Sequence, residues 1–230
     1  MSRFIFGMMQ SLDGYIAGPS GGPQPGGVFS AQAAAEFPPP GPVLGRHFND
    51  LVRGSDGFLY GRRLYEIMRY WDEDQPDWDE GDHDFAQAWR SKPKWVASRS
   101  LASVGPNATL VQGDLIDFAA KLKSEQDGDI DLAGAERANV LSAAGLVDEY
   151  RLSFRSVRAR HRYTLLAGSL PLLRLVRHHA IGEDAVLRAR LIIFHSGECR
   201  ECQTAFINPV HFRVQVRVQT SVRTNFVKLR

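Results

Sequence analysis

The sequence predicts a single α/β domain built on a mostly parallel, twisted central sheet, with helices on both faces and antiparallel strands at its C-terminal end. Two observations lead to this fold class. Short apolar runs alternate along the chain with amphipathic segments, as in successive strand and helix units. The run Glu149–Phe154 alternates apolar and polar residues with period two, which indicates a half-buried strand.

The composition is that of a globular protein and points to no polyanionic partner. The chain has 230 residues, of which 43% are hydrophobic and 23% charged, so it can bury a full core. Its 28 basic and 26 acidic side chains leave a formal charge of +2, which argues against nucleic acid or an anionic membrane as the main partner. No run is long and apolar enough to span a bilayer, and the N-terminus lacks the features of a signal peptide. We therefore expect a cytoplasmic protein.

The first half of the chain contains the start of the predicted sheet. Phe4–Met9 is a continuous apolar run, typical of a buried central strand. Residues 19–42 are rich in Gly, Pro and Ala and are interpreted as a mobile loop. A helix is expected over roughly His47–Arg53, a strand over Gly57–Tyr60, and a second helix from about Arg62, where apolar residues recur at helical spacing.

The middle of the chain continues the strand and helix rhythm. The acidic segment Asp72–Asp84 is interpreted as a solvated excursion. Strands are expected at Trp95–Ala97, Thr109–Val111 and Ile130–Ala133, and a helix is expected to begin after Asp114, a residue type suited to an N-cap.

The last predicted elements complete the sheet. The helix after residue 134 is expected to end at Gly145, because glycine favours the left-handed conformation that ends many helices. Leu172–Val176 and the segment around Ala185–Arg190 are expected to be terminal antiparallel strands.

Three predicted strands run into small residues that lie beside charged side chains. These turns are Tyr60-Gly61-Arg62-Arg63, Ala97-Ser98-Arg99-Ser100 and Ala133-Gly134-Ala135-Glu136. A small residue lets backbone N–H groups approach a phosphate, and the helix N-terminus adds a favourable partial charge. Arg62, Arg63 and Arg99 suit the 2′-phosphate that distinguishes NADPH from NADH. Each turn alone is explained by an ordinary strand-to-helix connection; the three together predict a dinucleotide site.

These turns belong to a set of motifs that resembles a known family. The set consists of Ser11-Leu12-Asp13-Gly14-Tyr15-Ile16-Ala17-Gly18, Gly61-Arg62-Arg63-Leu64-Tyr65-Glu66, Ala133-Gly134-Ala135-Glu136 and Gly145-Leu146-Val147-Asp148-Glu149-Tyr150. It is similar to the dihydrofolate reductase superfamily, in particular to its riboflavin-biosynthesis reductase branch, the RibD C-terminal domain. The resemblance implies a dihydrofolate reductase-like domain over residues 1–194, NADPH as cofactor, a small-molecule substrate and a homodimer.

The resemblance also implies roles for individual residues. The residues implied to line the cofactor are Gly61, Arg62, Arg63, Ser98, Arg99, Gly134, Ala135 and Glu136. Asp13 and Tyr15 are implied to lie near the substrate, with Asp13 as the catalytic residue that hydrogen-bonds the substrate or assists its protonation. An Asp-Gly pair is also a strong turn former, so Asp13 has an equally good structural interpretation.

The implied reaction is NADPH-dependent reduction of a small heterocycle, in the manner of 5-amino-6-(5-phosphoribosylamino)uracil reductase. One alternative is a dihydrofolate or pteridine reductase, for which Asp50 is a candidate acid. The other is a non-catalytic nucleotide-binding protein that kept the fold. The segment 155–163 favours this last alternative, because large basic and aromatic side chains stand where the family has a glycine-rich turn.

The extension 195–230 lies outside the family pattern. His195, Cys199, Cys202 and His211 are residue types that bind zinc, but one Cys pair with no standard spacing is weak support, so no metal site is predicted.

Overall fold

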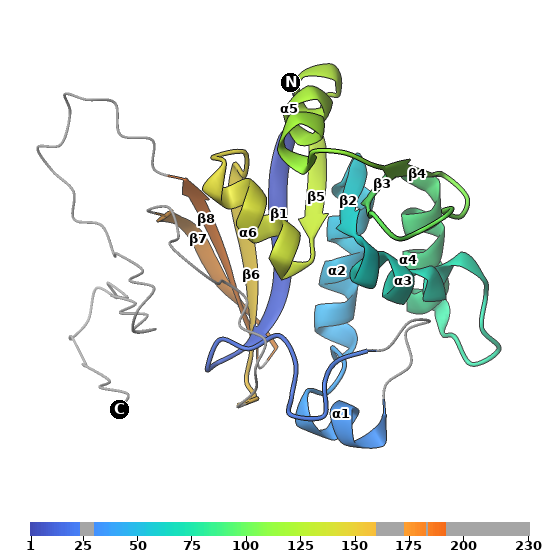
Figure 1. The fold of residues 1–230 in the computed structure, drawn as a ribbon. Coiled ribbons are helices and arrows are strands. Elements are labelled where there is room, and N and C mark those ends of the chain that lie inside the picture. Colours follow the sequence, from blue (N-terminus) through green and yellow to red (C-terminus); the bar gives the residue numbers. More distant parts are fainter. Residues whose placement is uncertain (24–29, 160–172, 183, 192–230) are drawn as a thin grey trace, which may run out of the picture.

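The structure of the chain, a computed structural model, describes residues 1–23, 30–159, 173–182 and 184–191, with 185–191 described by their backbone alone. These residues form an eight-stranded sheet in the order β4-β3-β2-β5-β1-β6-β8-β7 (Figure 1). Its strands are β1 (Arg3–Ser11), β2 (Gly57–Gly61), β3 (Lys94–Ala97), β4 (Ala108–Val111), β5 (Asp129–Ala133), β6 (Glu149–Arg155), β7 (Leu173–Ile181) and β8 (Asp184–Leu191). Strands β1 to β6 pair in parallel, and β8 pairs antiparallel with β6 and β7. The predicted fold class is confirmed.

Helices cover both faces of this sheet (Figure 1). They are α1 (Ala31–Glu36), α2 (Pro42–Gly54), α3 (Arg62–Met68), α4 (Glu80–Ser91), α5 (Leu115–Glu125) and α6 (Ala135–Ala143), with a 3-10 turn at Arg69–Asp72. On one face, side chains of α5 and α6 share a core with Phe4 and Phe6 of β1. On the other face, Val52 of α2 and Trp89 of α4 belong to one cluster with Phe58 of β2. Successive side chains of a strand point to opposite faces of the sheet, so the strands contribute residues to both cores.

The interpretation of the acidic segment Asp72–Asp84 as a solvated excursion is wrong in part: residues 73–79 lie outside helices and strands, but α4 begins at Glu80. The Asp79 carboxylate accepts the backbone N–H of Asp82 at 2.9 Å, and the Asp82 carboxylate accepts the N–H of Asp79 at 3.2 Å. This reciprocal cap starts the helix. Trp89 then anchors it, because its indole is fully buried. The acidic residues are therefore the start signal of a helix.

The interpretation of residues 19–42 as a loop is wrong in part. Helix α1 lies inside this segment, and the hydroxyl of Ser30 accepts the backbone N–H of Ala33 at its start. Helix α2 begins at Pro42, earlier than the predicted start at His47, because proline is well suited to the first turn of a helix. Residues 24–29 lie outside the described part of the chain.

The predicted end of α6 at Gly145 is confirmed. Gly145 has a φ of +70°, and its N–H donates to the carbonyl of Ser142 at 3.0 Å. The N–H of Leu146 donates to the carbonyl of Leu141 at 3.0 Å. This pair of bonds closes the last turn of the helix and directs the chain into β6.

Several predictions fall outside the described residues or stay untested. His195, Cys199, Cys202 and His211 are not described, and the domain boundary near residue 194 stays a prediction. Within the described ranges, no helix is long and apolar enough to cross a membrane. Among the same residues, no three potential metal ligands gather at one place.

Candidate functional site

Four strand ends lie next to one another at one edge of the sheet. In the strand order β3, β2, β5 and β1 are consecutive neighbours, and each neighbouring pair is parallel. The register sets Gly61 opposite Ala97 and Tyr60 opposite Ala133, so the turns after these strands leave the sheet at similar heights. The structure therefore brings together the three turns that the sequence predicts to surround one nucleotide. Strand β1 continues past the level of Ala133 to Ser11, so the turn after β1 projects farther from the sheet than its neighbours.

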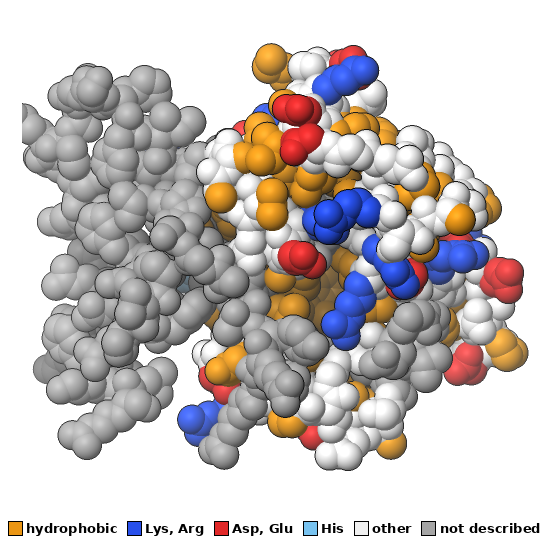
Figure 2. All heavy atoms as spheres, viewed as in Figure 1, with side chains coloured by type: hydrophobic (Ala, Val, Ile, Leu, Met, Phe, Trp, Pro, Cys, Tyr) orange, Lys and Arg blue, Asp and Glu red, His pale blue; other side chains and the backbone are white. Residues whose placement is uncertain are grey.

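The topology of the sheet predicts a crevice between the carboxyl ends of β1 and β5. The chain leaves β1 toward α2 on one face of the sheet, whereas it leaves β5 directly into α6 on the opposite face. Neighbouring parallel strands with such opposed connections form the crevice in which open α/β sheets bind ligands. The space-filling view shows a hollow on this side of the molecule, with apolar side chains at its floor and both Lys or Arg and Asp or Glu side chains on its rim (Figure 2).

Glycine is favoured at two positions of this edge, Gly134 and Gly61, for different physical reasons. Gly134 has a φ of +99°, which side-chain-bearing residues rarely adopt. It is the N-cap of α6, and no side chain among the described residues caps that helix. The N–H groups of the first turn of α6 are thus left for a ligand. At Gly61, a Cβ atom would lie 3.0 Å from Cγ of Arg137, so that strand end is closely packed against α6.

Arg62 links two of the turns. Its guanidinium donates hydrogen bonds to Oε1 of Glu66 at 2.9 Å and to Oγ of Ser100 at 2.8 Å. About half of the Arg62 side chain stays exposed. Ser98 is buried, and its hydroxyl accepts the N–H groups of Ser100 and Leu101. Its hydroxyl therefore shapes the turn after β3.

The remaining predicted cofactor residues lie on the same edge. Arg63 and Arg99 are exposed, and they make the rim positively charged together with Arg62. Ala135 and Glu136 form the first turn of α6, where Ala135 is half-buried and Glu136 is exposed. A carboxylate at this position suits hydroxyl donors better than phosphate oxygens. The location of these residues fits a bound nucleotide, while their contacts with one stay a prediction.

The carboxylate of Asp13 is engaged by its own chain. Oδ1 accepts the hydroxyl of Ser11 at 2.6 Å and the backbone N–H of Ala159 at 3.0 Å, and Oδ2 lies 3.9 Å from Nε of Arg158. The N–H of Tyr15 donates to the hydroxyl of Ser11 at 3.0 Å, which closes the turn after β1. The structural role proposed for Asp13 thus has direct support, and about a quarter of its side chain stays exposed.

Arg155 opens the segment in which the sequence departs from its family. Its buried guanidinium donates to Oδ2 of Asp184 at 3.0 Å and to the carbonyl of Pro38 at 2.7 Å. The backbone N–H of Ser156 donates to Oδ1 of the same Asp184. One large side chain therefore ties β6, β8 and the segment before α2 together at the carboxyl edge. Residues 160–163 lie outside the described part of the chain.

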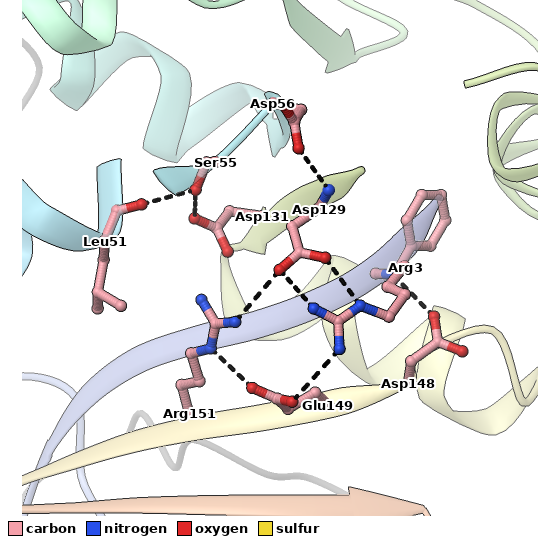
Figure 3. A network of polar contacts seen from close by, with 10 residues as sticks. Arg3, Leu51, Ser55, Asp56, Asp129, Asp131, Asp148, Glu149 and Arg151 are labelled. Carbon is pink, nitrogen blue, oxygen red and sulfur yellow. Dashed lines mark hydrogen bonds and ion pairs between the residues drawn. The ribbon is translucent and has the colours of Figure 1, made fainter. Parts of the chain in front are cut away.

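A ring of charged residues at the opposite edge of the sheet was not predicted from the sequence (Figure 3). Asp129 lies between two arginines, with Arg3 at 2.7 Å and Arg151 at 3.4 Å from its carboxylate. Glu149 closes the ring, because it pairs with Arg151 at 2.8 Å and lies 4.0 Å from Arg3. The strand starts of β1, β5 and β6 are thereby joined through side chains.

Asp131 lies beside this ring on the same face of β5 (Figure 3). Burial raises the pKa of its carboxyl to about 6, although the hydroxyl of Ser55 donates a hydrogen bond to it and Arg151 lies nearby. Asp131 is the middle residue of β5, and its hydrogen-bond donor Ser55 is the residue that ends α2. We therefore assign the ring and Asp131 to the packing of α2 on the sheet and keep the candidate site at the opposite edge.

The chain shares its fold with proteins connected to riboflavin biosynthesis. A protein assigned to riboflavin biosynthesis from Shewanella sp. PV-4 superposes with a TM-score of 0.59 at 20% identity, over 83% of this chain and 99% of that one. A pyrimidine reductase-like protein from Corynebacterium diphtheriae superposes with a TM-score of 0.55 at 11% identity, over 84% and 92%. A diaminohydroxyphosphoribosylaminopyrimidine deaminase/5-amino-6-(5-phosphoribosylamino)uracil reductase from Thermotoga maritima gives 0.55 at 8% identity, over 83% and 56%.

Sequence comparison places the chain in a family. YyaP, an uncharacterized protein of Bacillus subtilis (strain 168), is 28% identical over 159 residues, which cover 67% of this chain and 75% of that protein. The family model of the RibD C-terminal domain matches residues 3–187. The match includes all four turns of the carboxyl edge. The chain therefore belongs to the RibD C-terminal domain family.

Proposed function

We propose that this chain is an NADPH-dependent reductase of a small heterocyclic substrate, of the kind that reduces 5-amino-6-(5-phosphoribosylamino)uracil. One observation carries the proposal: the turns after β3, β2, β5 and β1 lie consecutively around one crevice. Membership of a reductase-like family supports the same reaction class.

The residues at the carboxyl edge fit a phosphorylated dinucleotide. The uncapped first turn of α6, behind Gly134, offers backbone N–H groups to a pyrophosphate. Arg62, Arg63 and Arg99 supply fixed positive charge for a 2′-phosphate, for which the planar guanidinium is well shaped. Glu136 at the start of the same helix suits a ribose hydroxyl. We assign NADPH to this edge on that donor set.

Bound NADPH would supply the hydride. The protein has to orient two rings and keep water away from them. The apolar side chains at the floor of the hollow serve the second task (Figure 2). Asp13 holds the turn after β1 through Ser11 and Ala159, and its partly exposed carboxylate would hydrogen-bond the substrate or pass it a proton.

A binding experiment tests the cofactor assignment. Nicotinamide fluorescence is followed while NADPH or NADH is titrated with the protein, and we expect NADPH to bind at least about tenfold more tightly. Arg99→Gln should reduce this preference. Arg174→Gln is the matched control, because Arg174 is an exposed arginine on β7, away from the edge formed by β3, β2, β5 and β1. Equal affinities for NADPH and NADH in the unaltered protein would contradict the assignment.

Turnover tests the reaction class. The oxidation of NADPH is followed at its absorbance band with a panel of aminouracil and dihydropterin substrates. Oxidation with an aminouracil ribose phosphate supports the proposal, whereas oxidation with dihydropterins alone would favour a pteridine reductase. Asp50, the candidate acid for that alternative, is a largely exposed side chain that pairs with Arg53 at 2.8 Å.

A non-catalytic nucleotide-binding protein is the second candidate. The observation in its favour is that Ser11, Arg158 and Ala159 already engage the carboxylate of Asp13. Tight NADPH binding without oxidation across the whole panel would support this candidate over the reductase.

The homodimer stays a prediction, which sedimentation of the purified chain would test.

A further inference from the structure

Gln10 is a buried polar side chain with no hydrogen-bond partner among the residues that the structure describes. Its exposed fraction is 0%, and within the described part of the chain neither its Nε2 nor its Oε1 atom has a hydrogen bond. Buried amides are normally paired, and an unpaired one costs free energy in the folded state. Such a group in a well-packed strand indicates a function outside the packing of the core.

The position of Gln10 places this amide at the crevice. Gln10 is the penultimate residue of β1, and its partner on the β6 side is Phe154. On the β5 side the last pair in the register is Phe6 with Leu132, and β5 ends at Ala133. Gln10 therefore extends beyond the end of β5, where the chain turns into α6.

The face of the strand fixes the direction of the side chain. Alternate residues of a strand lie on the same face, so Gln10 shares a face with Phe4, Phe6 and Met8. These residues belong to, or pack against, the core that also contains α6 side chains. The amide of Gln10 and the uncapped start of α6 thus lie on the same side of the sheet, at the same edge.

We propose that the carboxamide of Gln10 is a ligand-binding group that recognises a planar amide, with neighbouring C=O and N–H groups, on a ring bound in this crevice. A carboxamide pairs with such an amide through one donated and one accepted hydrogen bond. The inference rests on the proposed function, which supplies two ring systems of this chemistry: the nicotinamide carboxamide of the cofactor and the lactam of an aminouracil. Because Gln10 is shielded from solvent, a ring must displace a neighbour to reach it. Met8 is partly exposed and flexible enough to yield.

The variant Gln10→Met separates recognition from structure. Methionine keeps the length and volume of the side chain and removes both polar atoms. Without ligand, the variant should melt about 2–4 °C higher than the unaltered protein, because an unpaired buried amide is removed. With ligand, the same variant should bind about tenfold more weakly. A gain in stability together with a loss of affinity is not expected of a merely structural residue.

Three probes identify the ring that Gln10 contacts. They are NADPH, 2′-phospho-ADP-ribose, which lacks the nicotinamide, and 5-aminouracil titrated in the presence of NADP⁺. Weaker NADPH binding with unchanged 2′-phospho-ADP-ribose binding assigns Gln10 to the nicotinamide. Weaker 5-aminouracil binding with unchanged NADPH binding assigns it to the substrate. Gln126→Met is the control, because Gln126 is exposed at the C-terminal end of α5.

The outcomes separate this inference from the proposed function. If the unaltered protein binds NADPH and 5-aminouracil and Gln10→Met binds both equally well, the inference is overturned while the proposed function stands. If the unaltered protein binds none of the three probes, the proposed function fails, and the inference fails with it.

Discussion

The carboxylate of Asp13 accepts the backbone N–H of Ala159 at 3.0 Å, across the ends of two neighbouring strands. This bond joins the turn after β1 to the segment in which the chain departs from the rest of its family. Asp13 therefore combines a structural contact with a position at the crevice. Two substitutions distinguish these roles.

Asp13→Asn keeps an oxygen that can accept the hydrogen bonds of Ser11 and Ala159, and it removes the charge and the titratable proton. We expect its melting temperature to stay close to that of the unaltered protein and its turnover to fall by about 100-fold or more, the usual size of a lost acid or base. Asp13→Ala should lose turnover and also about 1–2 kcal/mol of stability, because a donor is left unpaired. Unchanged turnover in Asp13→Asn would remove this carboxylate from the reaction.

Arg155→Met should destabilise the fold strongly. The substitution leaves Asp184 buried beside β6 without its cation, and breaking a buried ion pair in this way costs about 3 kcal/mol. It also frees the carbonyl of Pro38, so limited proteolysis should become faster in the segment before α2. Urea unfolding measures the first effect, with the exposed Arg174→Met as control.

The pair of Arg155 and Asp184 can be isolated by a double substitution. Arg155→Met combined with Asp184→Asn should be less destabilised than the sum of the two single variants, by about 1 kcal/mol or more. Additive effects would mean that the ion pair makes no specific contribution.

Asp131→Asn should change how stability depends on pH. Burial raises the pKa of Asp131 in the folded protein to about 6, above its usual value, so the favourable contribution of its neutral form is complete at low pH and is lost as the pH rises through about 6. Asparagine stays neutral throughout. Relative to the unaltered protein, Asp131→Asn should therefore gain roughly 2 kcal/mol of stability between pH 4 and pH 7.5.

Urea unfolding at the two pH values measures this gain. Asp127→Asn is the control with the opposite sign, because the N-terminal ammonium lowers the pKa of Asp127 in the folded state. A gain for Asp131→Asn that is equal at both pH values would contradict the prediction.

Gly134→Ala and Gly145→Ala impose the same kind of backbone strain at opposite ends of α6. Both glycines have positive φ, +99° and +70°, so each substitution should cost about 1–3 kcal/mol. Only Gly134 borders the crevice, so only Gly134→Ala should also weaken NADPH binding, by about tenfold. Fluorescence titration of both variants checks this; equal affinities would place the cofactor away from α6.

Local signals in the sequence predicted the sheet and its carboxyl edge well. Gly57–Gly61 is a short run of mainly apolar residues, Asp129–Ala133 alternates polar and apolar residues, and Gly145 is a recognisable helix end. Helix α4 was missed because the many acidic residues around its start suggested solvated chain, although the cap made by Asp79 and Asp82 is a local signal that the sequence contains.

Contacts between distant residues account for what the sequence could not show. Nε of Arg3 donates to Oδ1 of Asp129 at 2.8 Å, although 126 positions separate the two residues, and no local pattern in the sequence marks either one. In the sequence, Gln10 is simply the polar residue that follows an apolar run. Its place beyond the end of β5 becomes visible only in the structure. Arg155 was recognised as a departure from its family, but its contact with Pro38 depends on how α1 and α2 fold.

The charged ring of Arg3, Asp129, Arg151 and Glu149 fastens the strand starts, while small residues and loops occupy the strand ends. The starts of these strands are therefore rigidly connected, whereas the ends of the strands can change in sequence and shape. A library of substitutions confined to residues 12, 15, 62–63, 99–100 and 135–136 would accordingly vary what the protein accepts while sparing the framework that keeps it folded.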